Sequence, residues 1–409
     1  MDAEPSHRTK GLLRLTMACN ERCPFCNVPV EDYPRPTPDD DAIDRALAAF
    51  ADERTVTISG GEPTLLRKRL LRVVAASRPR LVELQTNAVL IDAGYARALA
   101  DAGLTSAFVS LLSDVPALHD RLAGLDGAFA RCLAGIDALL DAGVRVTLNP
   151  VTAADTEARL PAYVDFVAER LPRVRSISVS AVQPHGRAAR SPELLPDYAV
   201  LGPAVREARR RAKAHGIELL NPYCGLPLCV GWEDGLDVSV EAIEAREGPR
   251  GVPGVENTGD KRHGPPCRAC VLRARCGGAW HAYWEVRGGS GIAPPETLRG
   301  PWHGDDAPFA WHLARSFAPG EAVAGDGLAL ELDHLDAASL RGVWQLLRSG
   351  PAIVWLGLRS PTAAVARESV ELAAVAGIEA VVLLVDEPER WRPLAAALSA
   401  RFGVDVRVG

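Results

Sequence analysis

The chain has 409 residues and a mass of 43.6 kDa, which suggests two or three domains. Apolar residues make up 47% and charged residues 24%, as in ordinary globular proteins. The longest apolar run, Ile378 to Val385, is broken by Glu379 and is far too short to span a bilayer. The net charge of −6 argues against a surface that binds nucleic acid. The first residues lack the apolar segment of a secretory signal, so we expect a cytoplasmic protein with no membrane or nucleic-acid partner.

Apolar strands alternate with amphipathic helices through the first half of the chain. This spacing implies right-handed crossovers and a parallel sheet. Because the stretch is shorter than the roughly 250 residues of a full eight-unit barrel, we predict an α/β fold with a partial (β/α)6 TIM-like barrel. The expected strands are 12–16, 55–59, 81–85, 107–112, 144–149 and 175–182, and the expected helices lie near 42–50, 65–77, 94–102, 127–142, 156–170 and 197–215.

The regular pattern stops after the barrel, which we place at 11–215. Residues 216–295 contain frequent Gly, Pro and Cys, which favours a small metal-stabilised domain. Residues 296–325 are rich in Pro, Gly and aromatic residues and are expected to form a linker. Strands alternate with helices again in 326–409, which predicts a small C-terminal α/β domain of unknown role.

The nine cysteines are grouped rather than scattered. In a chain without a secretory signal they are poor candidates for disulfides, and grouped cysteines indicate metal ligands. Only Cys132 stands alone, within an apolar helix pattern, and we expect it in the core.

Cys19, Cys23 and Cys26 form a C-x3-C-x2-C motif directly after the first strand. A structural zinc ion requires a fourth ligand, and none lies nearby in the sequence. A cubane iron–sulfur cluster held by three thiolates instead keeps one iron open for a small molecule. Half of a zinc site, completed from a distant part of the chain, is the alternative.

The second strand ends in Ser59-Gly60-Gly61-Glu62-Pro63-Thr64. Two glycines at a strand end let a ligand approach the backbone closely, and Glu62 offers a carboxylate to an ammonium group. A Gly-Gly turn with Pro63 opening the next helix is the alternative. The position of this segment, one strand–helix unit after the cysteine motif, favours a binding site.

The cysteine motif and Gly60-Gly61-Glu62-Pro63 together resemble the radical S-adenosylmethionine (SAM) superfamily, over roughly residues 11–215. The resemblance implies that the three thiolates bind a [4Fe–4S] cluster, whose open iron takes the amino and carboxylate groups of SAM. In that family an electron from the cluster cleaves SAM to methionine and a 5′-deoxyadenosyl radical, which abstracts hydrogen from a C–H bond. The protein supplies position and excludes solvent.

Further positions match this family. The resemblance implies that Phe25 lies near the adenine, that Asn87 binds the SAM carboxylate, that Ser110 contacts SAM and that Asn149 faces the ribose. For each of these residues a capping or turn role is an equal alternative. The segment from His119 to Gly124 resembles a peptide-maturase pattern, but Ala123 stands where the family frequently has an arginine that contacts SAM.

The second cysteine group lies in the irregular segment. Cys267, Cys270 and Cys276 read C-x2-C-x5-C, with Cys224 and Cys229 upstream, and this spacing alone fits zinc or a second iron–sulfur cluster. After a radical SAM core the segment resembles SPASM/twitch auxiliary domains, although Trp280 replaces the next cysteine of the full SPASM pattern. We therefore expect a single auxiliary [4Fe–4S] cluster. Its expected ligands are Cys229, Cys267, Cys270 and Cys276, with Cys224 as the competitor of Cys229.

These resemblances predict an enzyme that cleaves SAM reductively and abstracts hydrogen from a ribosomally synthesised peptide. A dehydrogenase or epimerase that acts on a sugar or antibiotic precursor is the alternative. Either enzyme needs a one-electron reductant such as flavodoxin or ferredoxin. A nonoxidative outcome would also need a hydrogen donor, for which Cys224 and Tyr223 are candidates, although cluster binding and packing are the favoured roles of these residues. A zinc-binding regulatory module and an electron-transfer protein without SAM are the competing classes.

Overall fold

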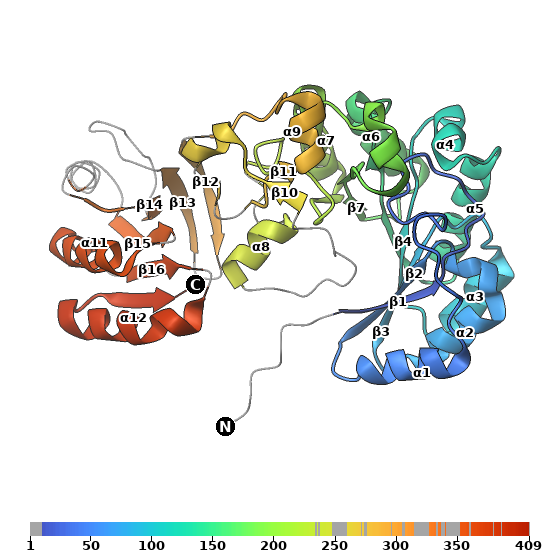
Figure 1. Ribbon diagram of the computed structural model, residues 1–409, viewed down its shortest axis with the longest axis horizontal. Helices are drawn as coiled ribbons and strands as arrows, with labels where there is room; N and C mark the ends of the chain where they lie inside the picture. The colour runs from blue at the N-terminus through green and yellow to red at the C-terminus, as the bar shows by residue number, and fades with distance from the viewer. Residues whose placement is uncertain are drawn as a thin grey trace.

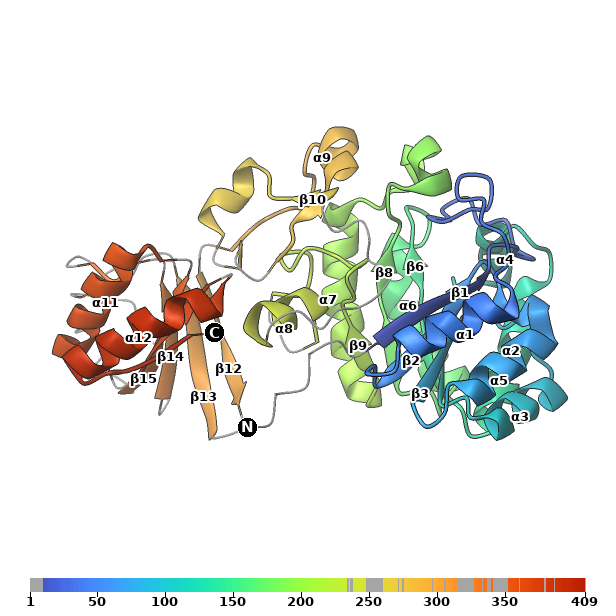
Figure 2. The same cartoon turned by 60° about the horizontal axis from the view of Figure 1, so that its bottom comes forward.

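The computed structural model describes most of the chain, with gaps. The described residues are 10–233, 235, 238–247, 260–270, 272–273, 276–295, 297–304, 307–314, 327–332, 334–336, 340, 352–359, 361–378, 380–385 and 387–408. Figures 1 and 2 show the cysteine-rich segment between the N-terminal sheet with its helices and the C-terminal sheet.

Seven parallel strands form the N-terminal sheet in the order β1-β2-β3-β4-β5-β7-β9. This order follows the chain, so each helical crossover leads to the neighbouring strand position, as in a TIM barrel that does not close. The strands are β1 (Lys10–Thr16), β2 (Thr55–Gly60), β3 (Leu81–Thr86), β4 (Ser106–Val109), β5 (Arg145–Leu148), β7 (Ser176–Ser178) and β9 (Glu218–Leu220).

The helices of this part lie on the outer side of the sheet (Figure 1). Several begin at an aspartate whose carboxylate accepts a backbone N–H of the first turn, as Asp39, Asp92 and Asp197 do. The helices are α1 (Asp40–Ala49), α2 (Arg67–Ala76), α3 (Ala93–Ala102), α4 (Pro116–Ala123), α5 (Ala128–Asp141), α6 (Leu160–Arg170) and α7 (Tyr198–His215).

The two faces of the sheet differ in chemistry. Alternate side chains, such as Val82 and Leu84 of β3, are fully buried in the hydrophobic core. The intervening side chains, such as Glu83 and Gln85, line a cavity instead. A closed TIM barrel fills its interior with bulky branched residues. Polar residues on this face leave room for a ligand.

The six expected strand–helix units are present, and the structure adds elements that the sequence pattern did not reveal. The expected strand 175–182 is divided into β7 and a short β8 (Ser180–Ala181), which pairs with β6 (Val151–Thr152) in a separate small sheet. The strand β9 has only three residues, and the helix α4 was expected only as a motif segment. Such short elements carry too little periodicity to be recognised.

The cysteine-rich segment shares its hydrophobic core with the N-terminal sheet. A single cluster of buried residues runs from Leu13 to Ile292 and includes Trp232 and Trp280. The described elements of the segment are α8 (Val240–Glu247), the antiparallel pair β10 (Lys261–Arg262) and β11 (Ala279–Trp280), and α9 (His281–Arg287).

The C-terminal part has its own core and a six-stranded sheet in the order β12-β13-β14-β15-β16-β17. The expected linker 296–325 differs from the structure, because β12 and β13 lie there as an antiparallel pair that joins this sheet. The aromatic residues of 296–325 are common in strands as well as in loops, so composition alone could not distinguish a linker from two strands. The elements are β12 (Thr297–Gly304), β13 (Ala307–Ala314), β14 (Gly327–Leu332), β15 (Ala352–Arg359), α11 (Ala363–Ala376), β16 (Ala380–Leu384), α12 (Pro388–Phe402) and β17 (Asp405–Val408).

None of the helices in the described ranges is both long and apolar enough to cross a membrane.

Candidate functional site

A cavity of about 640 Å³ lies on the inner face of the N-terminal sheet and at the carboxyl ends of its strands. Chemistry in barrel folds is placed at these strand ends. Most residues that the sequence predicted for SAM or cluster binding line this cavity; Pro63 does not, and it begins a short 3-10 helix instead. The lining residues from that prediction are Cys19, Cys23, Phe25, Cys26, Gly60, Gly61, Glu62, Asn87, Ser110, Asn149 and Cys224.

The diglycine segment is joined directly to the first cysteine loop. The Gly61 N–H donates to the Thr16 carbonyl at 2.7 Å, and the Glu62 N–H donates to the Ala18 carbonyl at 2.8 Å. Gly60 has φ of +140°, and a Cβ at Gly61 would collide with the Ala18 carbonyl. Glycine is therefore required for the two segments to approach each other.

Glu62 is the most buried charged group of the cavity wall, with 1% of its surface exposed. Its Oε1 accepts from the Thr64 N–H at 2.9 Å, the Thr64 hydroxyl at 2.6 Å and the Thr86 hydroxyl at 2.8 Å, and its Oε2 accepts from the Asn87 N–H at 2.8 Å. Burial raises the pKa of this carboxyl, and these hydrogen bonds oppose the shift. Glu62 thus ties the end of β2 to the end of β3.

The first cysteine loop is held by backbone contacts on several sides. The Ala123 carbonyl accepts from the Arg22 N–H at 2.8 Å, and the Arg187 guanidinium donates to the Cys23 carbonyl at 3.1 Å. The Glu21 N–H points to the Cys19 sulfur at 3.4 Å. The segment from His119 to Gly124 therefore supports the cysteine loop through the backbone of Ala123.

Burial raises the pKa of the Cys23 thiol well above its ordinary value and raises that of Cys26 as well. A buried thiol favours its neutral form, so a thiolate here requires compensation by a cation such as the iron of a cluster. The donor set, three thiols around one cavity wall, fits a cluster with an open corner.

The neutral polar residues of the cavity are fixed by short hydrogen bonds. Asn87 donates to the Asn20 side chain at 3.0 Å, and Asn149 accepts from the Ser180 hydroxyl at 2.7 Å. The Ser180 hydroxyl also lies 3.1 Å from the Cys224 sulfur. Ser180 and Cys224 therefore add to the polar residues of the cavity that the family resemblance implies.

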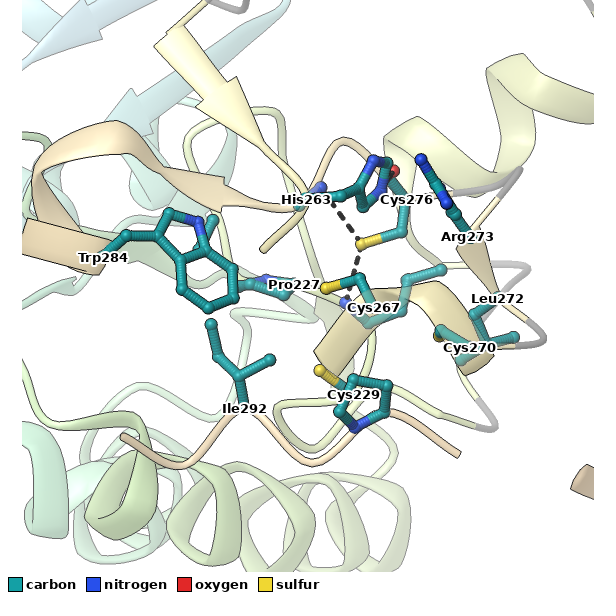
Figure 3. Close-up of a pocket in the computed structure, with 14 residues that line it drawn as sticks. Pro227, Cys229, His263, Cys267, Cys270, Leu272, Arg273, Cys276, Trp284 and Ile292 are labelled. Carbon is teal, nitrogen blue, oxygen red and sulfur yellow. Dashed lines mark hydrogen bonds between the residues drawn. The ribbon is translucent and has the colours of Figure 1, made fainter. Parts of the chain in front are cut away.

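Four other cysteines meet at a second, smaller pocket (Figure 3). Cys229, Cys267, Cys270 and Cys276 line it, and Trp284 and Ile292 cover its apolar side. The Cys276 sulfur accepts from the Gly278 N–H at 3.3 Å and the Leu228 N–H at 3.5 Å. Burial raises the pKa of Cys276 to about 12. Two of the four cysteines are buried and two are half-buried, and four thiols in one pocket are the ligand set of a fully coordinated cubane.

The structure thus separates Cys224 from the other four. A local reason is Asn221, whose side chain accepts from the Leu226 N–H at 2.8 Å and donates to the Leu226 carbonyl at 2.9 Å. The tight loop that results ends before Cys229. The Cys224 carbonyl is bound by the Ala181 N–H at 2.9 Å, which holds Cys224 at β8 and in the large cavity.

Within the described ranges, no three His, Cys, Asp or Glu side chains are arranged to hold a single metal ion. Ligands of a cubane bind different iron atoms, so they do not converge on one point as the ligands of a zinc ion do.

Sequence reasoning missed several cavity residues, among them Arg14, Ser180 and Gln183. Trp280 was considered only as a missing cysteine, yet it also lines the large cavity. The inward positions of the strands alternate, so a period of two along each expected strand was the signal that could have found Arg14.

Comparison with known proteins agrees with these motifs. The sequence pattern of the Radical SAM superfamily matches residues 13–167. The PqqA peptide cyclase of Gluconobacter oxydans (strain 621H) is 30% identical over 226 residues, which cover 53% of this chain and 62% of the relative. The Fe-coproporphyrin III synthase of Methanosarcina barkeri (strain Fusaro / DSM 804) is 30% identical over 167 residues, which cover 39% of this chain and 41% of the relative. The matches thus span only part of each relative.

Among solved structures, native anSMEcpe with bound AdoMet has a TM-score of 0.42 and 15% identity, over 51% of this chain and 64% of that one. The matched sequence pattern and the relatives together identify residues 13–167 as a radical SAM domain.

Proposed function

We propose that this chain cleaves SAM reductively in the large cavity and abstracts a hydrogen atom from a ribosomally synthesised peptide. The observation that carries the proposal is the single cavity that unites the C-x3-C-x2-C loop, the diglycine segment and the polar strand ends. When bound, the [4Fe–4S] cluster and SAM would supply the electron and the 5′-deoxyadenosyl radical. The protein's part is to bind and orient SAM and the substrate and to exclude water from the cavity.

The residues assigned to this site have distinct roles in the proposal. Cys19, Cys23 and Cys26 hold the cluster and leave one iron open. Glu62 uses three of its hydrogen bonds on Oε1, so Oε2 keeps acceptor capacity for the SAM ammonium group. Phe25, Asn87, Ser110 and Asn149 contact the remainder of SAM, as the family resemblance implies; Gly60 and Gly61 let it approach the backbone.

We assign the auxiliary [4Fe–4S] cluster to Cys229, Cys267, Cys270 and Cys276. The support is their common pocket, which Cys224 does not line (Figure 3). Full thiolate coordination leaves no iron open for substrate, which suits a cluster that passes electrons. A flavodoxin- or ferredoxin-type protein is the proposed external reductant.

A peptide substrate is supported by relatives such as the PqqA peptide cyclase, whose name states that it acts on a peptide. The shared segment covers about half of this chain, so the inference rests on the core domain. The second candidate is a redox-neutral reaction, such as epimerisation, on a small molecule. It is favoured by the Cys224 thiol in the large cavity, because a thiol there can return a hydrogen atom to a substrate radical.

The test is anaerobic reconstitution of the full chain, reduction with dithionite in the presence of SAM, and quantification of 5′-deoxyadenosine. We expect product from the native chain and from Cys132→Ala, whose thiol lines neither pocket, and none from Cys23→Ala. Equal product from Cys23→Ala would reject the assignment. Deuterium transfer from a labelled candidate peptide or sugar into 5′-deoxyadenosine then distinguishes the two substrate classes.

A further inference from the structure

A cationic side chain on the floor of the large cavity has no partner in the described part of the chain. Arg14 lies on β1, five residues before the first cysteine, and lines the cavity. Among the described residues its guanidinium makes no hydrogen bond or ion pair. The Arg187 guanidinium, on the same cavity wall, is instead paired with Glu31 at 2.5 Å and donates to the Cys23 carbonyl at 3.1 Å.

The neighbours of Arg14 across the sheet are already bonded to one another. Arg14 is in register with Ser59 of β2. The Ser59 hydroxyl donates to the Gln85 side-chain oxygen at 2.7 Å, and the Thr57 hydroxyl donates to Glu83 at 3.2 Å. Because the Gln85 oxygen accepts this bond, its amide group keeps N–H donors for the cavity. The floor next to Arg14 therefore offers the N–H donors of Gln85, and its one carboxylate, Glu83, already accepts from Thr57.

The carboxylates of the cavity do not compensate Arg14. Three carboxylates line the cavity. Glu62 is held by Thr64, Thr86 and Asn87, Glu83 accepts from the Thr57 hydroxyl at 3.2 Å, and Glu21 accepts from the Cys23 thiol at 3.5 Å. In the described part of the chain none of the three forms an ion pair with Arg14. A half-buried guanidinium without a counterion is poorly solvated, so an anion that pairs with it there gains more than it would on an open surface. The planar fork of arginine matches the two oxygens of a carboxylate.

We propose that Arg14 is a specificity-determining residue that binds a carboxylate of the substrate. This inference rests on the proposed function. If the substrate is a peptide, the carboxylate belongs to the side chain of an aspartate or glutamate. The carboxylate of SAM is the other source of the same chemistry. We favour the substrate because Arg14 lies on the sheet floor, below the strand end that carries the cysteine loop and the diglycine segment.

The experiment uses the reconstituted full chain with SAM and without reductant. The probes are N-acetyl-glutamate N-methylamide and its neutral isostere N-acetyl-glutamine N-methylamide, with binding measured by calorimetry. We expect the acid to bind about tenfold more tightly than the amide, and Arg14→Gln to remove that preference. Arg35→Gln is the matched control, because Arg35 is an exposed arginine at the same cavity. Arg14→Lys should keep part of the preference.

Equal binding of acid and amide by the native chain would overturn the inference, as would an unchanged preference in Arg14→Gln. Weaker SAM binding by Arg14→Gln, measured in the same titration without probe, would assign Arg14 to SAM and also overturn it. Circular dichroism melting of each variant checks the fold. The proposed function is tested separately: failure of the native chain to produce 5′-deoxyadenosine from SAM contradicts the function itself, whereas equal binding of acid and amide by a native chain that does produce it contradicts only the inference on Arg14.

Discussion

Gly61 shows how one residue couples the two halves of the candidate SAM site. Its N–H binds the Thr16 carbonyl at 2.7 Å, and it has no room for a side chain next to the Ala18 carbonyl. We expect Gly61→Ala to push the diglycine segment away from the cysteine loop and to weaken SAM binding at least about tenfold. Equilibrium binding of SAM to the reconstituted chain measures this.

Gly202→Ala in α7 is the control, because its nearest neighbour would lie 3.5 Å from the new Cβ. Alanine is also the better helix former, so the control should bind SAM normally and be at least as stable. Normal SAM binding by Gly61→Ala would show that the close approach is not needed.

The cysteines of the irregular segment make a second prediction at this scale. Cys229→Ser should lose the auxiliary cluster, which is about four iron atoms per chain. Cys224→Ser should keep its iron, because Cys224 lies in the large cavity and not in the pocket of the four cysteines. Iron and sulfide analysis after anaerobic reconstitution shows which of the two variants has lost a cluster. Loss of iron from Cys224→Ser but not from Cys229→Ser would show that Cys224, and not Cys229, is the cluster ligand.

Part of the site could be foreseen from local residues. The spacing of Cys19, Cys23 and Cys26 and the diglycine segment are contiguous in sequence, so their chemistry is visible there. The separation of Cys224 from the pocket that Cys229 lines is not visible there, since it depends on the loop fixed by Asn221. Arg14 belongs to no sequence motif, and its proposed role depends on its lack of a partner among the residues that the structure describes.

At the scale of elements, contacts of the start of α7 with α9 and with the residues that follow α9 hold the cysteine-rich segment against the barrel. The rings of Tyr198 and Tyr283 stack at 3.7 Å between centroids. The Tyr283 hydroxyl accepts from the Tyr198 N–H at 2.8 Å and donates to the Ser290 carbonyl at 2.7 Å. The Ser290 hydroxyl in turn donates to Asp197 at 2.8 Å.

Tyr283→Phe keeps the stacked ring but leaves the Tyr198 N–H buried without its acceptor. We expect a loss of about 1–3 kcal/mol of unfolding free energy, seen as a lower melting temperature of the reconstituted chain. Tyr33→Phe is the matched control at a partly exposed tyrosine and should be neutral. A melting temperature equal to that of Tyr33→Phe would contradict the role of the hydroxyl.

The strand–helix units of the barrel were predictable because each has a long apolar pattern of its own. Elements that depend on distant partners were not. The strand β9 has three residues and is defined by its pairing with β7, and β12 and β13 are defined by their pairing with each other. Composition suggested a linker at β12 and β13, because the strand propensity of a residue depends on the partners with which its strand pairs.

At the scale of the whole molecule, the barrel and the cysteine-rich segment share one hydrophobic core, whereas the C-terminal sheet has its own. Trp280 links the two cysteine sites: it lines the large cavity, and the preceding residues Gly278 and Ala279 line the smaller pocket. This continuity suits the proposed transfer of electrons between the auxiliary cluster and the large cavity.

Mössbauer spectroscopy of the chain reconstituted with iron-57, recorded with and without SAM, tests the central claim most directly. We predict about eight iron atoms per chain in two cubanes, with one iron site of one cubane changing its parameters when SAM binds. Cys23→Ala should keep only the cubane that does not respond to SAM. A chain that takes up zinc alone, or two cubanes that both ignore SAM, would contradict the account.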